Sequence, residues 1–141
     1  MSMDDPGFTI AQVDAAIEFV TRNGAENRAM SVNYSLVFDA ADLPAPQQLH
    51  QGGESEIVTQ FMGAFHRRCL ELEYPPLDSL VVHVAGERGG VPGGGYFRIN
   101  GVPDPFGKRT SVEDQATSGR FLEEQRAKCR SWGDARRRRR P

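Results

Sequence analysis

The stretch from Tyr74 to Gly101, YPPLDSLVVHVAGERGGVPGGGYFRING, places two apolar runs on either side of a loop that holds six of the fifteen glycines. The first run, Leu80 to Ala85, is typical of a buried strand, and Tyr96 to Ile99 is typical of an antiparallel partner for it. Because glycine has no Cβ, the backbone N–H groups of such a loop can approach an anion or a partner closely. We expect contacts from this loop at Gly89, Gly90, Gly93, Gly94, Gly95 and Tyr96.

Apolar side chains at helical spacing predict a helix directly before this stretch, from Ser55 to about Glu73. The two prolines that follow Tyr74 end it, since proline has no N–H with which to continue a helix. Another helix is predicted near the start of the chain, where Thr9 and Gln12 have the spacing of a capping box. A last helix begins at Thr110 or Ser111 and runs toward Arg130.

The segment from Ser31 to Ala41 has an ambiguous pattern. Its apolar residues alternate as in a strand, but several of them also share one helical face. We favour a helix that is capped by Ser31 and ended by the Asp42-Leu43-Pro44 sequence.

Charge is unevenly divided along the chain. The 141 residues carry a formal net charge of −2, but five of the seventeen basic residues are consecutive, from Arg136 to Arg140. The rest of the chain has twelve basic and nineteen acidic residues, for a charge of −7. We therefore predict one acidic globular domain over residues 1–130 and a disordered, arginine-rich tail over residues 131–141.

The sequence shows neither a secretory signal nor a membrane span, and the cellular compartment is predicted from this. The opening MSMDDPGFTI has neither a basic nor an apolar signal region, and no apolar run reaches the length of a membrane span. Cys69 and Cys129 do not form a paired motif, which favours free thiols in a reducing compartment. We expect a cytoplasmic protein without a membrane partner.

Nucleotide-binding and catalytic motifs fail on spacing. In GVPDPFGKRT, five residues rather than four separate Gly101 from Gly107, and Arg109 stands where a P-loop needs Ser or Thr. The glycines of the loop do not form G-x-G-x-x-G. Nothing supplies an oxyanion hole or a lowered thiol pKa, so we expect a non-enzymatic protein without a cofactor.

A metal site is possible only if distant residues meet. His66 and Cys69 are three residues apart on one predicted helix, and His83 and Cys129 would have to join them to complete a tetrahedral set. Cys69 falls on the apolar stripe of its helix, where a free cysteine acts as a small buried hydrophobe. We therefore expect no metal.

The order of the predicted elements over residues 31–101 resembles the winged-helix DNA-binding domain of the alkyltransferase-like proteins. The matching features occur in sequence order, at Tyr34, Ser55–Glu73, Pro75-Pro76, Leu80–Val84 and Gly89–Gly95. The resemblance implies an α+β fold, a compact helical domain with a small antiparallel β-hairpin as its wing. The turn from Pro75 to Ser79 contains no cysteine, which argues against alkyl transfer. The strings P-P-L-x-x-L-V-V and G-x-P-x-G-G-Y are also similar to those of uncharacterised proteins of mobile elements and bacterial defence.

Two functional hypotheses follow. The first is a small DNA-binding protein that contacts duplex DNA through basic residues of the helix, the wing and the tail. Those residues are Arg67, Arg68, Arg88, Arg98, Lys108, Arg109, Arg136, Arg137, Arg138, Arg139 and Arg140. The second is a protein-interaction module, such as a subunit or inhibitor in a bacterial or phage defence system, whose acidic body docks on a basic partner. An outward Tyr96 or Phe97 in an apolar patch favours the second hypothesis. A pocket that combines His83 with an arginine would instead indicate an anion-binding enzyme.

Overall fold

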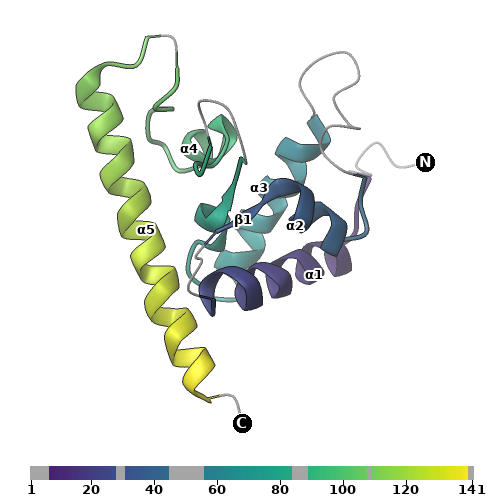
Figure 1. Cartoon of the computed structure of the whole chain (residues 1–141). Helices are drawn as coiled ribbons and strands as arrows, with labels where there is room; N and C mark the ends of the chain where they lie inside the picture. Colours follow the sequence, from purple (N-terminus) through teal and green to yellow (C-terminus); the bar gives the residue numbers. More distant parts are fainter. Residues whose placement is uncertain (1–6, 28–30, 45–55, 84–88, 108, 140–141) are drawn as a thin grey trace.

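Nine helices, helical turns and strands occur in the described part of the protein. The computed structural model describes residues 7–27, 31–44, 56–83, 89–107 and 109–139. In chain order the elements are α1 (Ile10–Val20), the π-helical turn η1 (Thr21–Ala25), β1 (Val32–Asn33), α2 (Tyr34–Ala40), α3 (Glu56–Glu71), the 3-10 turn η3 (Leu77–Leu80), β2 (Val81–Val82), α4 (Gly94–Ile99) and α5 (Val112–Arg139). Figure 1 shows α1, α2 and α3 grouped together, with α5 running along one side of the molecule.

The helices α1 and α3 lie where the sequence predicts them. The Thr9 hydroxyl accepts from the Gln12 N–H at 3.2 Å, and the Gln12 side chain accepts from the Thr9 N–H at 2.9 Å, which confirms the capping box. The Gln12 amide also donates to the carbonyl of Ala41 at 2.9 Å, so this cap ties the start of α1 to the end of α2.

The ambiguous Ser31–Ala41 segment contains both structures. Val32 and Asn33 form strand β1, and the chain then turns directly into α2. The cap is Asn33 rather than Ser31, because the Asn33 side chain accepts from the Leu36 N–H at 2.9 Å. The preference for a helix was therefore right for Tyr34–Ala40 and wrong for the two residues before it.

The predicted antiparallel hairpin is wrong, and so is the winged-helix-like α+β fold class that depends on it. Strand β2 pairs in parallel with β1, with Val32 opposite Val81 and Asn33 opposite Val82. The expected partner strand, Tyr96 to Ile99, lies in helix α4. A strand would turn neighbouring side chains to opposite faces, whereas α4 buries both Tyr96 and Phe97. The described structure is therefore α-rich, with a two-stranded parallel sheet.

Two hydrophobic clusters hold these elements together. The larger is built on aromatic residues of α2 and α3, with Phe38, Phe61 and Phe65 fully buried, and it extends to η3 through Leu77 and Leu80. The smaller consists of Tyr96, Phe97 and Leu122, with Val91, Val102 and Phe121 packed around it. The second cluster joins the glycine-rich segment and α4 to the first half of α5.

Helix α5 begins at the predicted place but continues past the predicted end. Its cap is Ser111, whose hydroxyl accepts from the Asp114 N–H at 3.0 Å. The helix has 28 residues and runs to Arg139, so residues 131–139 of the predicted tail are its last turns. Helix α5 crosses residue 130 without a break, and the division into a domain and a tail at that residue stays a prediction. Within the described residues, no helix combines the length and the apolar character that crossing a membrane requires.

Candidate functional site

The predicted DNA-contacting residues lie on several separate segments. Arg67 is exposed on α3, Arg98 is exposed on α4, and Arg109 is exposed shortly before α5. Arg136 to Arg139 occupy the end of α5. Arg88, Lys108 and Arg140 lie outside the described residues.

Arg68 forms hydrogen bonds with two carboxylates of the protein itself, those of Asp14 and Glu71. Its Nε donates to Asp14 Oδ1 at 2.8 Å, and a terminal nitrogen donates to Asp14 Oδ2 at 3.3 Å. It also donates to Glu71 at 3.3 Å. The hydrogen bonds to these carboxylates raise the pKa of Arg68, with Asp14 contributing most. Arg68 therefore links α3 to α1.

Arg136 and Arg137 attach the end of α5 to the turn after α1. The Arg136 guanidinium lies 4.7 Å from the ring centre of Trp132 and 5.8 Å from that of Tyr74. Its Nε is 3.4 Å from Glu26 Oε2, and only 7% of the Glu26 side chain is exposed. Arg137 donates to the Glu26 carbonyl at 3.2 Å and to Asp134 at 2.9 Å. Two of the predicted tail arginines therefore make contacts that position the helix.

Arg126 has a similar structural position in the middle of α5. Its Nε donates to the carbonyl of Ser79 and a terminal nitrogen donates to the carbonyl of Gly90, each at 3.0 Å. Burial lowers the pKa of this guanidinium. Arg126 thus joins α5 to η3 and to the glycine-rich segment.

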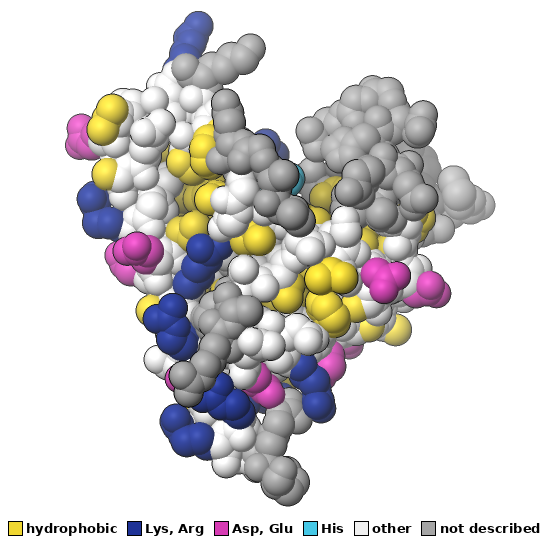
Figure 2. All heavy atoms as spheres, in the orientation of Figure 1, with side chains coloured by type: hydrophobic (Ala, Val, Ile, Leu, Met, Phe, Trp, Pro, Cys, Tyr) yellow, Lys and Arg dark blue, Asp and Glu magenta, His cyan; other side chains and the backbone are white. Residues whose placement is uncertain are grey.

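The charge of α5 changes sign along its length. The acidic half, residues 112–125, has four acidic residues and one basic residue. The basic half, residues 126–139, has seven basic residues and one acidic residue, for a formal charge of +6. Four of the seven are exposed and form no ion pair with any described residue: Lys128, Arg130, Arg138 and Arg139. Figure 2 shows basic side chains, in dark blue, gathered over the lower part of α5.

The glycine-rich segment, Gly89 to Gly95, is exposed at its start and partly buried where it enters α4. Gly89 and Gly90 are exposed, whereas Gly93, Gly94 and Gly95 are partly covered and lead into α4. The Gly93 N–H donates to the Tyr34 hydroxyl at 2.9 Å. Tyr96 is only 7% exposed, and its ring contacts Phe97 and Phe121.

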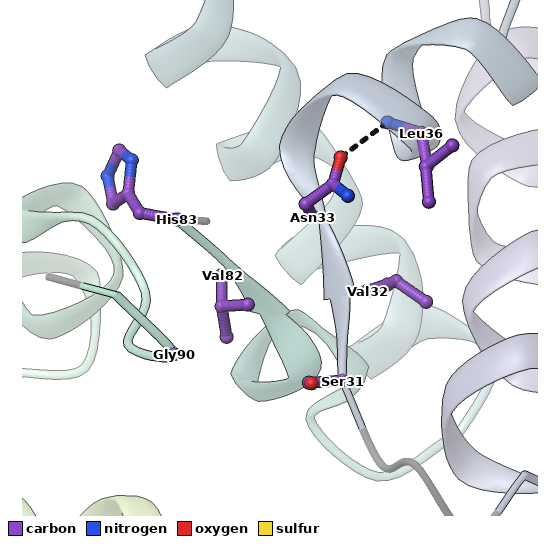
Figure 3. A pocket seen from close by; sticks show the side chains of 7 residues that line it. All are labelled: Ser31, Val32, Asn33, Leu36, Val82, His83 and Gly90. Atoms are coloured by element: carbon purple, nitrogen blue, oxygen red, sulfur yellow. Dashed lines mark hydrogen bonds between the residues drawn. The ribbon is translucent and has the colours of Figure 1, made fainter. Parts of the chain in front are cut away.

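An open hollow of about 310 Å³ lies beside the two strands. Figure 3 shows His83 at one side of it and the Asn33–Leu36 capping hydrogen bond at the other, with Val82 and Gly90 below His83. Among the described residues, no arginine lines this hollow. Among its described lining residues, this hollow therefore does not combine His83 with an arginine, the pairing that would indicate an anion-binding enzyme.

The buried thiols are not activated. Cys69 and Cys129 are both buried and free, and burial raises the pKa of Cys129 to about 12 and raises that of Cys69 as well. His66 instead pairs with the buried carboxylate of Asp78, at 2.9 Å between Nδ1 and Oδ2. No group of three or more His, Cys, Asp or Glu that could hold a metal ion occurs among the described residues.

The sequence pattern did not indicate Lys128 and Arg130 as DNA contacts, because the positive charge was assigned to a tail, Arg136 to Arg140, that was expected to be separate from the helix. The available signal was composition, since seven of the fourteen residues from 126 to 139 are basic. The role of Glu26 had no local signal, because its partners Arg136 and Arg137 are more than a hundred residues away in the chain.

Comparisons with protein-family models, with curated proteins and with solved structures found no match for this chain. A functional assignment therefore depends on the chain's own residues. Of the features described, the basic half of α5 has the largest concentration of exposed, unpaired charge.

Proposed function

We propose that this chain is a small non-enzymatic DNA-binding protein whose principal contact surface is the outward side of the basic half of α5. The observation that carries the proposal is the set of four exposed cations without an ion-pair partner among the described residues, Lys128, Arg130, Arg138 and Arg139. Each cation placed on a phosphate releases condensed counterions, which favours association without any requirement for sequence.

The negative charge of the rest of the chain would orient the protein as it approaches DNA. Without its arginine run, the chain carries a charge of −7, and the acidic half of α5 contributes −3 of it. A polyanion is repelled by this part and attracted to the far end of α5. The uneven charge therefore favours contact at one end of the molecule over coating of its whole surface.

The described residues also support a binding role over a catalytic one. Both thiols are buried with raised pKa values, so neither is a ready nucleophile. The hollow beside the strands is open and has no arginine among its described lining residues. A phosphate substrate would find little charge complementarity there.

Binding to a labelled DNA duplex, measured by fluorescence anisotropy over a salt series, tests the proposal. The test variant has four substitutions to glutamine, at Lys128, Arg130, Arg138 and Arg139. If each cation contacts one phosphate, the slope of log K against log salt should be about 3 to 4 smaller in magnitude for the variant. Between 50 and 200 mM salt, those contacts alone predict an affinity loss of roughly a hundredfold for the unmodified protein.

A matched control separates local contact from total charge. It replaces four exposed arginines outside the basic half with glutamine, at Arg67, Arg98, Arg109 and Arg120. Its net charge equals that of the test variant, but its salt slope should stay near that of the unmodified protein. Absence of binding at low salt, or equal losses in the two variants, would refute the proposal.

The alternative of a protein-interaction module has weaker support in the structure. The apolar patch that would favour it was expected around an outward Tyr96 or Phe97, and both side chains are buried. The acidic body is compatible with a basic partner protein, for example in a defence system. This alternative gains support if DNA fails to bind and a basic protein is captured in a stable complex.

A further inference from the structure

We infer that the basic half of α5 binds as a preformed helix seated in the major groove, so that the preferred partner is B-form duplex DNA over single strands and over double-stranded RNA. This inference rests on the proposed function and deepens it. It follows from how the helix end is anchored and from how its cations are distributed around the helix axis.

The end of α5 is held by the body of the protein. Gly133 lies so close to Ala25 that a Cβ at position 133 would stand 1.9 Å from the Ala25 carbonyl oxygen. One helical turn later, Arg136 stacks over Trp132 and pairs with Glu26. These contacts stabilise the last turns of α5 as a helix in the free protein, and Figure 1 shows the helix continuing to its lower end. A preformed helix avoids the ordering cost that a disordered arginine tail would incur on binding.

Three of the four exposed cations lie on two opposite flanks of the helix, and the fourth, Arg138, points outward between them. At about 100° per residue, Lys128 and Arg130 point roughly 200° apart, and Arg139 returns to the flank of Lys128. Cys129, which lies between the first two in sequence, is buried against the body. The outward strip between the flanks starts with two small exposed residues, Ala127 and Ser131.

This arrangement fits the major groove of B-form DNA. The groove is about 12 Å wide and admits one α-helix, with a phosphate strand along each side. Cations on both flanks can then contact both strands. The small side chains of Ala127 and Ser131 let the first turns of the basic half approach the base edges, and Arg138 points toward the groove floor further along. The major groove of A-form RNA is deep and narrow and does not admit side chains in this way, and a single strand offers only one row of phosphates.

Three labelled nucleic acids of equal length test the inference: a DNA duplex, an RNA duplex of the same sequence, and one of the DNA strands. Anisotropy at one fixed salt concentration should show the DNA duplex binding at least about tenfold more tightly than either of the others. On the DNA duplex, methylation of guanine N7, which lies in the major groove, should interfere with binding by the unmodified protein.

A variant that keeps every charge gives an independent readout. Ala127→Leu with Ser131→Leu adds bulk to the outward strip and should weaken DNA-duplex binding several-fold. Ala116→Leu with Thr117→Leu places the same residues on exposed positions of the acidic half and should leave binding unchanged. Circular dichroism and urea unfolding of both variants establish that α5 is intact.

The possible results separate the two levels of the argument. No binding to any of the three nucleic acids overturns the proposed function and this inference together. Equal binding to all three, or a preference for RNA or single strands, leaves nucleic-acid binding standing and overturns the groove assignment. Insensitivity to guanine N7 methylation overturns it as well, whatever the variants show.

Discussion

Gly133 of α5 lies against the carbonyl group of Ala25, with the position of a hypothetical Cβ 1.9 Å from the carbonyl oxygen. Backbone cannot move away as a flexible side chain can, so only glycine allows α5 to pass this closely over the turn after α1. The contact connects residues 108 positions apart and sets where the basic half of α5 lies on the body.

Gly133→Ala should destabilise the protein or displace the end of α5. We expect a loss of about 2 kcal/mol or more in the free energy of unfolding, because the added methyl overpacks a backbone contact. Urea unfolding followed by circular dichroism measures it. Gly119→Ala is the matched control on the same helix: nothing lies within 4 Å of a Cβ there, and the higher helix propensity of alanine should stabilise by about 0.5–1 kcal/mol. Equal effects of the two substitutions would contradict the close approach at Gly133.

Asn33→Ala should weaken helix α2 by removing its cap. Loss of the hydrogen bond from the Leu36 N–H predicts a destabilisation of about 1 kcal/mol in urea unfolding. Ser31→Ala, at the exposed residue that the sequence pattern indicated as the cap, should change stability by less than about 0.5 kcal/mol. A larger effect at Ser31 than at Asn33 would show that the helix begins earlier than described.

The His66–Asp78 pair predicts a pH dependence of stability. The hydrogen bond to Asp78 raises the pKa of His66 above its usual value of 6.5, against an opposing effect of burial. A raised folded-state pKa gives stabilisation that is complete below pH 6.5 and is lost as the pH rises through the folded value. Unfolding free energies measured from pH 5.5 to 8.5 should therefore fall across this range.

The controls for that profile are two histidine substitutions. His66→Gln should flatten the fall, whereas His83→Gln, at an exposed histidine, should preserve it. A profile that is unchanged in His66→Gln would mean that another group titrates.

Cys69 and Cys129 should resist thiol reagents in the folded protein. Both are buried and their pKa values are raised by burial, so little thiolate is present at pH 8. Absorbance after addition of Ellman's reagent should show almost no reaction in buffer and two thiols per chain in denaturant. Rapid labelling of one thiol without denaturant would show that its site opens to solvent.

Local patterns in the sequence predicted the elements that depend on near neighbours. The capping box of α1 joins residues three positions apart, and the apolar stripe of α3 repeats every three or four residues, so both are visible in a short window. The start of α5 was predicted at Thr110 or Ser111 from a capping box of Thr110 and Glu113, whereas the hydroxyl that caps the helix is that of Ser111, bound to the Asp114 N–H.

The candidate site was only partly predictable. Sequence composition indicated the basic end of the chain, but it grouped Arg136 and Arg137, which contact Glu26, with Arg138 and Arg139, which are exposed. Whether an arginine is available to a partner depends on which distant residue reaches it. Composition contains no such information.

The sequence by itself determined that α1 and α3 are helices and that positive charge is concentrated near the chain's end. Of the strand predicted over Leu80 to Ala85, Val81 and Val82 form β2, Leu80 belongs to the 3-10 turn, and Val84 and Ala85 lie outside the described residues. Only the tertiary structure decided that β2 pairs in parallel with β1 and that Tyr96 and Phe97 are helical. It also decided which cations of α5 remain exposed. The physical reason is range: capping and periodicity act over a few residues, whereas strand pairing, the burial of two adjacent aromatic side chains and the approach of Gly133 to Ala25 need segments that meet only in the folded chain.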